Sequence, residues 1–393
     1  MANGSQRGLT QTFQRFFASE KAGGLILVGC TILSLAIANS DLGGAYQAVW
    51  HAKFLGMSVE HWVNDGLMAV FFLLIGLELQ RELKSGELSS FRNAMLPIVA
   101  AVGGIVVPAA IHFALNAGTP TADGIGIPMA TDIAFALGAL SLLGARVPLS
   151  LKVFLTALAV MDDLGAIIVI AVFYTAEVSL LHLGAALLVF GLLLFCKSRQ
   201  ILALPVYLIG GAVMWYLMLK SGVHATIAGV ILAFAIPYSA IRDDQKSPSH
   251  RLEHWLHRPV AFGVLPVFAL ANTGVVIGAD WLANLGHPNS VGILAGLVLG
   301  KPVGILLASA LAVAAGLCRL PGDVRWSHIA GAGMLGGIGF TMSIFIANLA
   351  FPGQSALVDE SKMAIFLASL LSGVAGLLWL RWVAPASVPL KSS

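Results

Sequence analysis

The sequence predicts an all-α membrane protein of about twelve transmembrane helices, and three observations support this fold class. Of its 393 residues, 58% are hydrophobic and only 10% are charged, whereas soluble domains carry about 25% charged residues. Apolar stretches long enough to cross a bilayer, which takes about 20 residues, recur along the whole chain. Glycine and proline are frequent within them, as membrane helices tolerate. The composition therefore excludes a soluble domain, and nothing in it supports nucleic acid binding.

A 20-residue window divides the chain into twelve spans within a single polytopic membrane domain, residues 1–393. Ahead of the first span, apolar residues at helical spacing predict a cytoplasmic helix on the membrane surface within residues 1–22. Residues 385–393 are expected to form a cytoplasmic tail. The predicted spans are 23–39, 61–80, 94–115, 125–144, 150–174, 179–196, 201–218, 222–238, 257–277, 290–317, 327–350 and 361–384.

Lysine and arginine are distributed very unevenly between the two sides of the predicted membrane. With the N-terminus inside, 18 of the 22 fall in cytoplasmic segments, three in outer loops, and Lys301 within a span. Positively charged short loops remain in the cytoplasm. Both termini are therefore expected to be cytoplasmic, and the number of spans is expected to be even.

Two spans are interrupted by residues that break helices. The fourth reads GIGIPMATDIAFALG and the eleventh reads GAGMLGGIGFTMSIF. Breaks in paired positions predict two inverted-topology repeats, residues 94–174 and 290–384, and indicate a transport site at the broken helices. The alternative is that these glycines serve only the close packing of helices.

Four ionisable residues lie far from either predicted membrane surface: Asp132, Asp162, Asp163 and Lys301. Each costs about 2.5–3.5 kcal/mol at the centre of a membrane helix. A single ion pair that fixes helix register would explain one aspartate and the lysine. With three carboxylates and one lysine, at least one carboxylate lacks a fixed counter-charge. An apolar environment makes such a carboxylate easier to protonate. A carboxylate of this kind can exchange a proton for a cation.

The expected cation is Na⁺, a hard ion that prefers oxygen ligands such as carboxylates, the Thr131 hydroxyl and freed backbone carbonyls. No nucleotide-binding loop, nucleophile elbow or HExxH motif occurs, so neither a cofactor nor an enzymatic activity is expected. A passive cation channel remains as an alternative. An intramembrane aspartyl protease is a weaker one, because the GxGD pattern of such proteases is absent.

Over nearly its whole length the sequence resembles the bacterial NhaA-type Na⁺/H⁺ antiporters. The segments that carry the resemblance are VNDGLMAVFFLLIGLELQRELKSGEL, IPMATDIAFALGALSLLGARVPLSLKVFLTALAVMDDLGAIIVIA, LKSGVHATIAGV, RLEHWLHRP, LANTGV, GKPVGI and GGIGFTMSIFIA.

The resemblance implies a role for each residue of the predicted site. Asp163 would be the principal Na⁺ ligand and Thr131 a second ligand. Asp162 would pair with Lys301, and Asp132 would be a compensating charge at the crossing, the point where the two broken helices cross. Asp162 and Asp163 would carry the protons. The family exports Na⁺ or Li⁺ across the bacterial inner membrane against incoming protons, electrogenically and at alkaline pH.

The resemblance also implies a pH-sensing group at the cytoplasmic surface, consisting of Glu78, Arg81, Glu82, Glu253 and His254. The alternative is that these are ordinary interfacial charges at helix ends. Homodimerisation is left open, because family members that dimerise through a hairpin after the first span have a longer segment than residues 40–60 provide.

Overall fold

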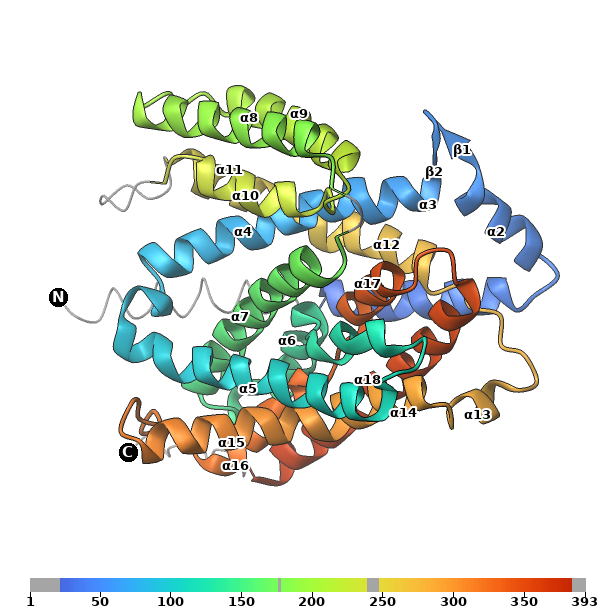
Figure 1. The fold of residues 1–393 in the computed structure, drawn as a ribbon. Helices are drawn as coiled ribbons and strands as arrows, with labels where there is room; N and C mark the ends of the chain where they lie inside the picture. The colour runs from blue at the N-terminus through green and yellow to red at the C-terminus, as the bar shows by residue number, and fades with distance from the viewer. Residues whose placement is uncertain (1–21, 176–177, 239–246, 384–393) are drawn as a thin grey trace.

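The fold is known from a computed structural model, which describes residues 22–175, 178–238 and 247–383. The predicted surface helix, apart from Ala22, and the predicted tail 385–393 lie outside the described residues. The described part of the chain is built from helices, with one short hairpin of two-residue strands (Figure 1). The predicted all-α fold class is confirmed.

The chain begins its described part with a helix over Ala22–Ala38, and the other elements follow in sequence order. They are α2 (Gly43–His51), β1 (Lys53–Phe54), β2 (Met57–Ser58), α3 (Val59–His61), η1 (Trp62–Leu67), α4 (Met68–Lys84), η2 (Glu87–Ser89), α5 (Phe91–Asn116), η3 (Ala122–Met129), α6 (Ile133–Leu142), η4 (Gly144–Arg146), α7 (Leu149–Phe173), α8 (Leu180–Ser198), α9 (Leu204–Ser221), α10 (Ile227–Ala235), α11 (Pro248–Pro259), η6 (Val260–Val264), α12 (Leu265–Asn272), α13 (Trp281–Asn284), α14 (Pro288–Ala295), η7 (Gly296–Gly300), α15 (Lys301–Ala314), α16 (Trp326–Gly336), α17 (Phe340–Ala350) and α18 (Ser355–Val383).

Each predicted span corresponds to a helix or to consecutive helices of the structure. Among the described residues, 8 helices are long and apolar enough to cross a membrane, and up to 10 spans result if each bent helix pair counts as one. The two other predicted spans, 222–238 and 257–277, correspond to α10, which has only 9 residues, and to α12 with the helical turns that precede it.

The link between the first two spans contains more structure than the sequence predicted. Helix α2 is bent by 114° from the first helix, and β1 and β2 pair antiparallel after it. Gly43 permits the bend, because a Cβ atom there would lie 2.4 Å from the carbonyl oxygen of Ala38. The polar residues around the turn gave no periodic pattern from which α2 could be predicted.

Helix α7 lies at the centre of the fold, and α8 and α9 lie at its edge (Figure 1). The share of buried residues in an apolar 18-residue window differs between these helices. It is 61% for α7 but only 11% for α8. The leucines at the start of α8 are exposed, Leu180 to 79% and Leu181 to 80%. Lipid is the solvent at this surface, so apolar side chains need not face the core.

The two predicted repeat segments pack against each other through α5 and α15, which cross at a pair of glycines. A Cβ atom on Gly103 would lie 2.2 Å from the Gly304 carbonyl oxygen, and one on Gly304 would lie 2.1 Å from the Gly103 oxygen. Only glycine on both helices allows this approach. The contact brings α15, which begins at Lys301, beside the broken spans.

Candidate functional site

The two interrupted spans cross at their breaks, as the sequence predicted. Between η3 and α6 the chain is extended from Ala130 to Asp132. Between α16 and α17 the helix axis bends by 48°. The Asp132 backbone N–H donates to the Ile338 carbonyl oxygen at 2.7 Å, so the two breaks are joined directly. Each break lies near the middle of its span, where unpaired backbone groups have no water to bond with.

Asp132 lies at the N-termini of two half-helices. Its Oδ1 accepts a hydrogen bond from the Phe135 N–H at 3.1 Å and caps α6. Its Oδ2 accepts from the Thr341 N–H at 3.1 Å and from the Thr341 hydroxyl, at the start of α17. Helix N-termini carry a partial positive charge of about +0.5, which a carboxylate compensates. One buried side chain thus serves both positive ends.

The two C-terminal ends at the crossing find different partners. The Lys301 ammonium donates to the carbonyl oxygen of Met129, the last residue of η3. The Thr131 hydroxyl lies 2.7 Å from the carbonyl oxygen of Gly336, the last residue of α16. All four half-helix ends therefore have polar partners inside the protein.

Asp162, Thr131 and Lys301 form one buried cluster. Asp162 Oδ2 lies 2.8 Å from Lys301 Nζ and 2.6 Å from the Thr131 hydroxyl oxygen. The three residues are fully buried. Thr131 has a single hydroxyl hydrogen but two oxygens within bonding distance, Asp162 Oδ2 and the Gly336 carbonyl. The other carboxylate oxygen of Asp162, Oδ1, has no hydrogen-bond partner among the described residues, so it could still bind a cation that prefers oxygen ligands.

Asp163 differs from its neighbour in the contacts of its carboxylate. It lies near the middle of α7 and is 1% exposed. Neither of its carboxylate oxygens has a hydrogen-bond partner among the described residues. Adjacent residues point about 100° apart on a helix, which explains why Asp162 meets Lys301 and Asp163 does not. A buried carboxylate without a partner is rare, because its ionised form loses hydration without compensation.

A π-helical turn precedes Lys301, and the sequence analysis did not predict it. Residues Gly296–Gly300 form η7, which leads into α15. Such wide turns are rare and frequently lie at functional sites. Pro302 follows Lys301 and lacks the backbone N–H that a regular helix would use as a donor. A proline shortly after the segment Gly296–Gly300 was therefore the sequence signal that could have predicted an irregular helix here. Two further π-helical turns lie among the described residues: η6 also precedes a proline, Pro266, whereas η1 is followed by Met68.

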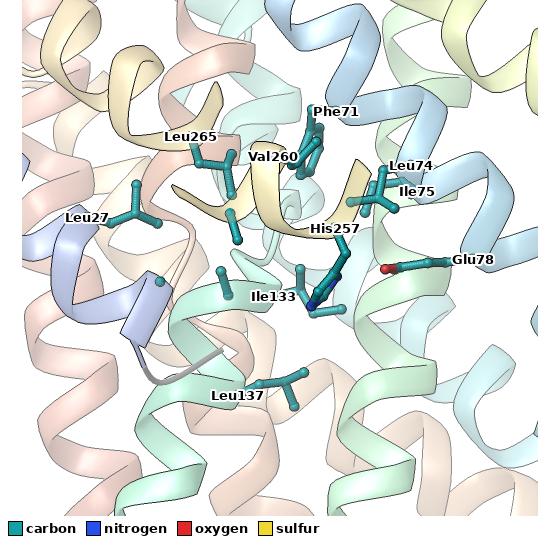
Figure 2. Close-up of a pocket in the computed structure, with 13 residues that line it drawn as sticks. Leu27, Phe71, Leu74, Ile75, Glu78, Ile133, Leu137, His257, Val260 and Leu265 are labelled. Atoms are coloured by element: carbon teal, nitrogen blue, oxygen red, sulfur yellow. The ribbon is translucent and has the colours of Figure 1, made fainter. Parts of the chain in front are cut away.

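A cavity of about 40 Å³ opens beside the start of α6, and we call it the Glu78 cavity. Figure 2 shows the Glu78 carboxylate and the His257 ring turned toward the same space, with Ile133 and Leu137 of α6 below them. Ile133 follows Asp132 in the chain. The cavity thus lies between the crossing and the end of α4.

The other predicted pH-sensing residues gather where α4 meets α11. Arg81 lies 2.8 Å from Glu253 and 3.2 Å from Glu82. His250, which was not among the predicted residues, lies 3.9 Å from Glu253, whereas His254 is exposed. Burial raises the pKa of the Glu253 carboxyl, and the Arg81 guanidinium opposes that shift.

Comparison with known proteins identifies the family of the chain. Residues 14–380 match the family model described as Na⁺/H⁺ antiporter 1. The chain belongs to the NhaA-type Na⁺/H⁺ antiporter family.

Curated relatives named Na⁺/H⁺ antiporter NhaA match the chain over most of its length. The protein from Dechloromonas aromatica is 67% identical over 96% of this chain and 97% of its own. NhaA 1 from Flavobacterium johnsoniae is 57% identical over 95% of this chain and 98% of its own. NhaA 2 from Pseudomonas syringae is 51% identical over 93% of this chain and 94% of its own. The family is one of multi-pass membrane transporters, in agreement with the apolar helices of the fold.

In this NhaA-type chain the structure brings most of the predicted site together. Thr131, Asp132, Asp162 and Lys301 are joined by direct contacts or through the crossing. Thr131 bonds to Asp162, whereas no hydrogen bond joins it to Asp163 within the described part of the chain. Thr341 was missed, although it directly follows the glycine-rich break and its hydroxyl was a visible candidate.

Proposed function

We propose that this chain exports Na⁺ or Li⁺ from the bacterial cytoplasm across the inner membrane in exchange for protons, by alternating access to Asp163. The observation that carries the proposal is the buried Asp163 carboxylate, both oxygens of which lack a hydrogen-bond partner among the described residues. A proton or a Na⁺ ion can neutralise it, but one excludes the other. Competition for one group couples the movements of the two ions in opposite directions.

Na⁺ at Asp163 would draw its other ligands from the adjoining cluster. The Thr131 hydroxyl has one hydrogen for two neighbouring oxygens, Asp162 Oδ2 and the Gly336 carbonyl, and Asp162 Oδ1 has no hydrogen-bond partner among the described residues; these oxygens are the candidate ligands. Asp132 and Lys301 keep the half-helix ends compensated while the occupant of the site changes. Their proposed role is to hold the crossing together.

Asp162 is proposed as the second proton carrier. When its pair with Lys301 opens, the carboxylate can take a proton, and when the proton leaves the pair can form again. Two protons exchanged for one Na⁺ would move one net positive charge inward in each cycle. Transport would then be electrogenic.

The arrangement of the cavities supports an exchanger over a channel. The Glu78 cavity and a larger cavity lined by Lys362 lie at opposite ends of the fold, and neither includes Asp162 or Asp163 in its lining. A channel needs a continuous path, whereas an exchanger opens the site to one side at a time. Residues 94–174 and 290–384 are proposed as the inverted repeats whose relative movement opens each side in turn, with both chain termini in the cytoplasm.

The cluster of Glu78, Arg81, Glu82, Glu253 and His254 is proposed to activate transport at alkaline pH. It lies at the end of α4 beside the Glu78 cavity, through which cytoplasmic Na⁺ would enter. Loss of protons from this cluster would change the contact between α4 and α11 that Arg81 and Glu253 maintain.

The test is proton movement in respiring inside-out membrane vesicles, to which Na⁺, Li⁺ or K⁺ is added between about pH 6.5 and 8.5. Wild-type protein is expected to dissipate the proton gradient when Na⁺ or Li⁺ is added at alkaline pH, and Asp163→Asn is expected not to respond. Asp323→Asn is the matched control, because Asp323 is an exposed carboxylate between α15 and α16.

The outcomes distinguish the two candidate functions. If Asp163→Asn behaves like wild type and like Asp323→Asn, exchange does not use the buried carboxylate and the proposal fails. If Na⁺ crosses without proton movement, the chain is a cation channel.

A further inference from the structure

A large cavity opens at the end of the fold opposite to Arg81, and we call it the Lys362 cavity. Its volume is about 580 Å³, and its lining includes Glu60, Asn64, Asn348 and Lys362. From Asn64 to Arg81 the chain runs through η1 and α4 without interruption, which places the two ends about 25 Å apart at 1.5 Å per residue. Under the proposed orientation this is the outer side.

Lys362 is an unusual residue for the wall of such a cavity. It lies in the first part of α18 and is 8% exposed. Its ion pair with Asp359 spans 3.8 Å, and 49% of the Asp359 side chain is exposed, against 10% for Lys362. A long contact to a solvated carboxylate compensates a buried ammonium poorly. Ionisable side chains in membrane proteins usually face a water-filled cavity and mark an ion pathway.

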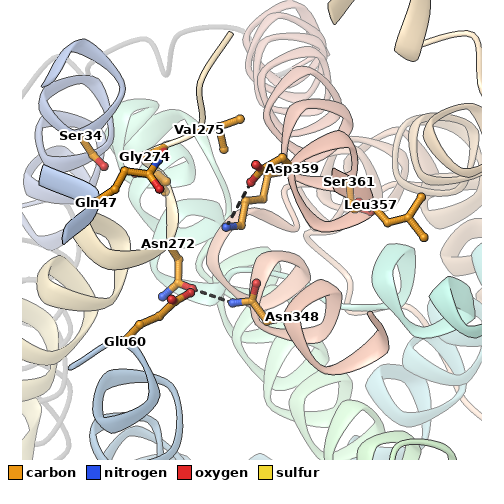
Figure 3. A network of polar contacts seen from close by, with 12 residues as sticks. Ser34, Gln47, Glu60, Asn272, Gly274, Val275, Asn348, Leu357, Asp359 and Ser361 are labelled. Atoms are coloured by element: carbon orange, nitrogen blue, oxygen red, sulfur yellow. Dashed lines mark hydrogen bonds and ion pairs between the residues drawn. The ribbon is translucent and has the colours of Figure 1, made fainter. Parts of the chain in front are cut away.

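The floor of the Lys362 cavity is closed by three asparagines from different helices. The Asn272 side-chain amide donates to Asn64 Oδ1 at 2.8 Å and accepts from Asn348 Nδ2 at 2.6 Å. Asn272 is fully buried. Figure 3 shows Asn272 and Asn348 bonded to each other on one side of the space and Asp359 on the other.

This floor lies close to the crossing of the broken spans. Asn348 is on α17, seven residues after Thr341, which is about 10 Å along a helix. Thr341 is bonded to Asp132. One turn before Asn348, Phe345 packs against Phe72 and Phe268 with ring centroids 5.5 and 6.3 Å apart. An ion that leaves the crossing toward this side passes the aromatic layer and the asparagines, and then enters the space that Lys362 lines.

We propose that Lys362 is a positioning residue for ion release, whose fixed positive charge lowers the affinity for Na⁺ on the outer side of the membrane. The inference rests on the proposed Na⁺/H⁺ exchange. A Na⁺ ion that has entered the Lys362 cavity comes within reach of this charge: at a separation of about 8 Å and an effective dielectric constant of about 40, the repulsion weakens its binding there by about 5-fold. The direction and driving force of transport are unchanged, because the ion gradients set them. Exported Na⁺ is less readily rebound.

The experiment compares the half-saturating Na⁺ concentration on each side, using inside-out and right-side-out vesicles that contain the same protein. Lys362→Met removes the charge and keeps an unbranched side chain that is one atom shorter. It is expected to lower the half-saturating concentration about 5-fold on the outer side and to leave the inner value within about 2-fold. Lys362→Arg keeps the charge and is expected to resemble wild type.

Lys53→Met is the matched control, because Lys53 is an exposed lysine of β1 on the same side that does not line the cavity. Raising the ionic strength with an impermeant salt should reduce the difference between Lys362→Met and wild type, since screening weakens the interaction. If Lys362→Met does not accumulate in the membrane, Lys362→Gln carries the same comparison.

The inference is overturned if removing the charge leaves the outer half-saturating concentration unchanged or changes both sides equally. Failure of the proposed function is a separate result, because wild-type vesicles would then show no Na⁺-dependent proton movement on either side.

Discussion

Removing Lys301 should destabilise the protein by about 3–5 kcal/mol, because Asp162 would then lack its counter-charge inside the membrane. The Lys301 Nζ lies 2.8 Å from Asp162 Oδ2, and both side chains are fully buried. The Met129 carbonyl at the end of η3 would also lose its hydrogen-bond donor. Asp162→Asn should cost a similar free energy, since it leaves the ammonium without an opposite charge.

The double variant Asp162→Asn/Lys301→Met tests this reasoning. It contains neither buried charge, and the introduced amide oxygen can still accept from the Thr131 hydroxyl, which lies 2.6 Å from the carboxylate in wild type. The double variant should be no less stable than either single variant. That corresponds to a coupling free energy of at least about 3 kcal/mol, at or above the upper end of the range for residues in contact.

The assay is unfolding of the purified proteins by sodium dodecyl sulfate in dodecyl maltoside micelles, followed by tryptophan fluorescence. Lys220→Met, which removes an exposed lysine at the end of α9, is the control and should change stability by less than about 0.5 kcal/mol. Simple addition of the two single-variant costs in the double variant would refute the reasoning, because the two charges would then not depend on each other.

Three further predictions follow from other parts of the structure. Asp163→Asn should abolish transport but unfold at the same or a higher detergent concentration than wild type, because the carboxylate has no hydrogen-bond partner to lose among the described residues. Marked destabilisation would reveal a structural role of Asp163. Gly103→Ala should lower the free energy of unfolding by about 3 kcal/mol, because the added methyl group forces α5 away from Gly304. Gly191→Ala, whose Cβ atom would meet nothing within 4 Å, should be neutral. Equal thermal unfolding midpoints of the two variants would contradict this. Because burial raises the pKa of Glu253 above its unfolded value, protonation stabilises the fold, so wild type should lose stability relative to Glu253→Gln as pH rises from about 4.5 to the folded pKa; a constant difference across a pH series would count against it.

The broken spans were the part of the site most accessible to sequence reasoning. Gly126 and Pro128 in one span and Gly336, Gly337 and Gly339 in the other are residues that helices avoid, and the structure has both interruptions. Local backbone preference is sufficient for such a prediction, because each break depends on a few adjacent residues. The pairing of the two breaks through Asp132 and Ile338 could not be read in the same way.

Apart from Thr341, the residues of the site and of the Lys362 cavity that sequence reasoning missed lack a local signal. Met129 and Gly336 take part through backbone carbonyls, which every residue possesses, so their side chains say nothing about it. Asn64, Asn272 and Asn348 are far apart in the chain and meet only because η1, α12 and α17 converge. A lone asparagine in a membrane span becomes informative when its partner is known.

The sequence by itself determined that the chain is a helical membrane protein, approximately where its spans run, and that Asp132, Asp162, Asp163 and Lys301 are buried. These properties follow from composition and local periodicity, since the bilayer demands apolar helices and makes every buried charge conspicuous. Only the tertiary structure gives the physical reason that Asp162, rather than Asp163, is paired. Asp162 and Asp163 are chemically identical neighbours, and the packing of α15 and the broken spans against α7 places Lys301 and Thr131 beside Asp162, while Asp163 has no hydrogen-bond partner in the described part of the chain. The free energy of a buried carboxylate depends on neighbours contributed by distant segments, and local sequence does not encode their positions.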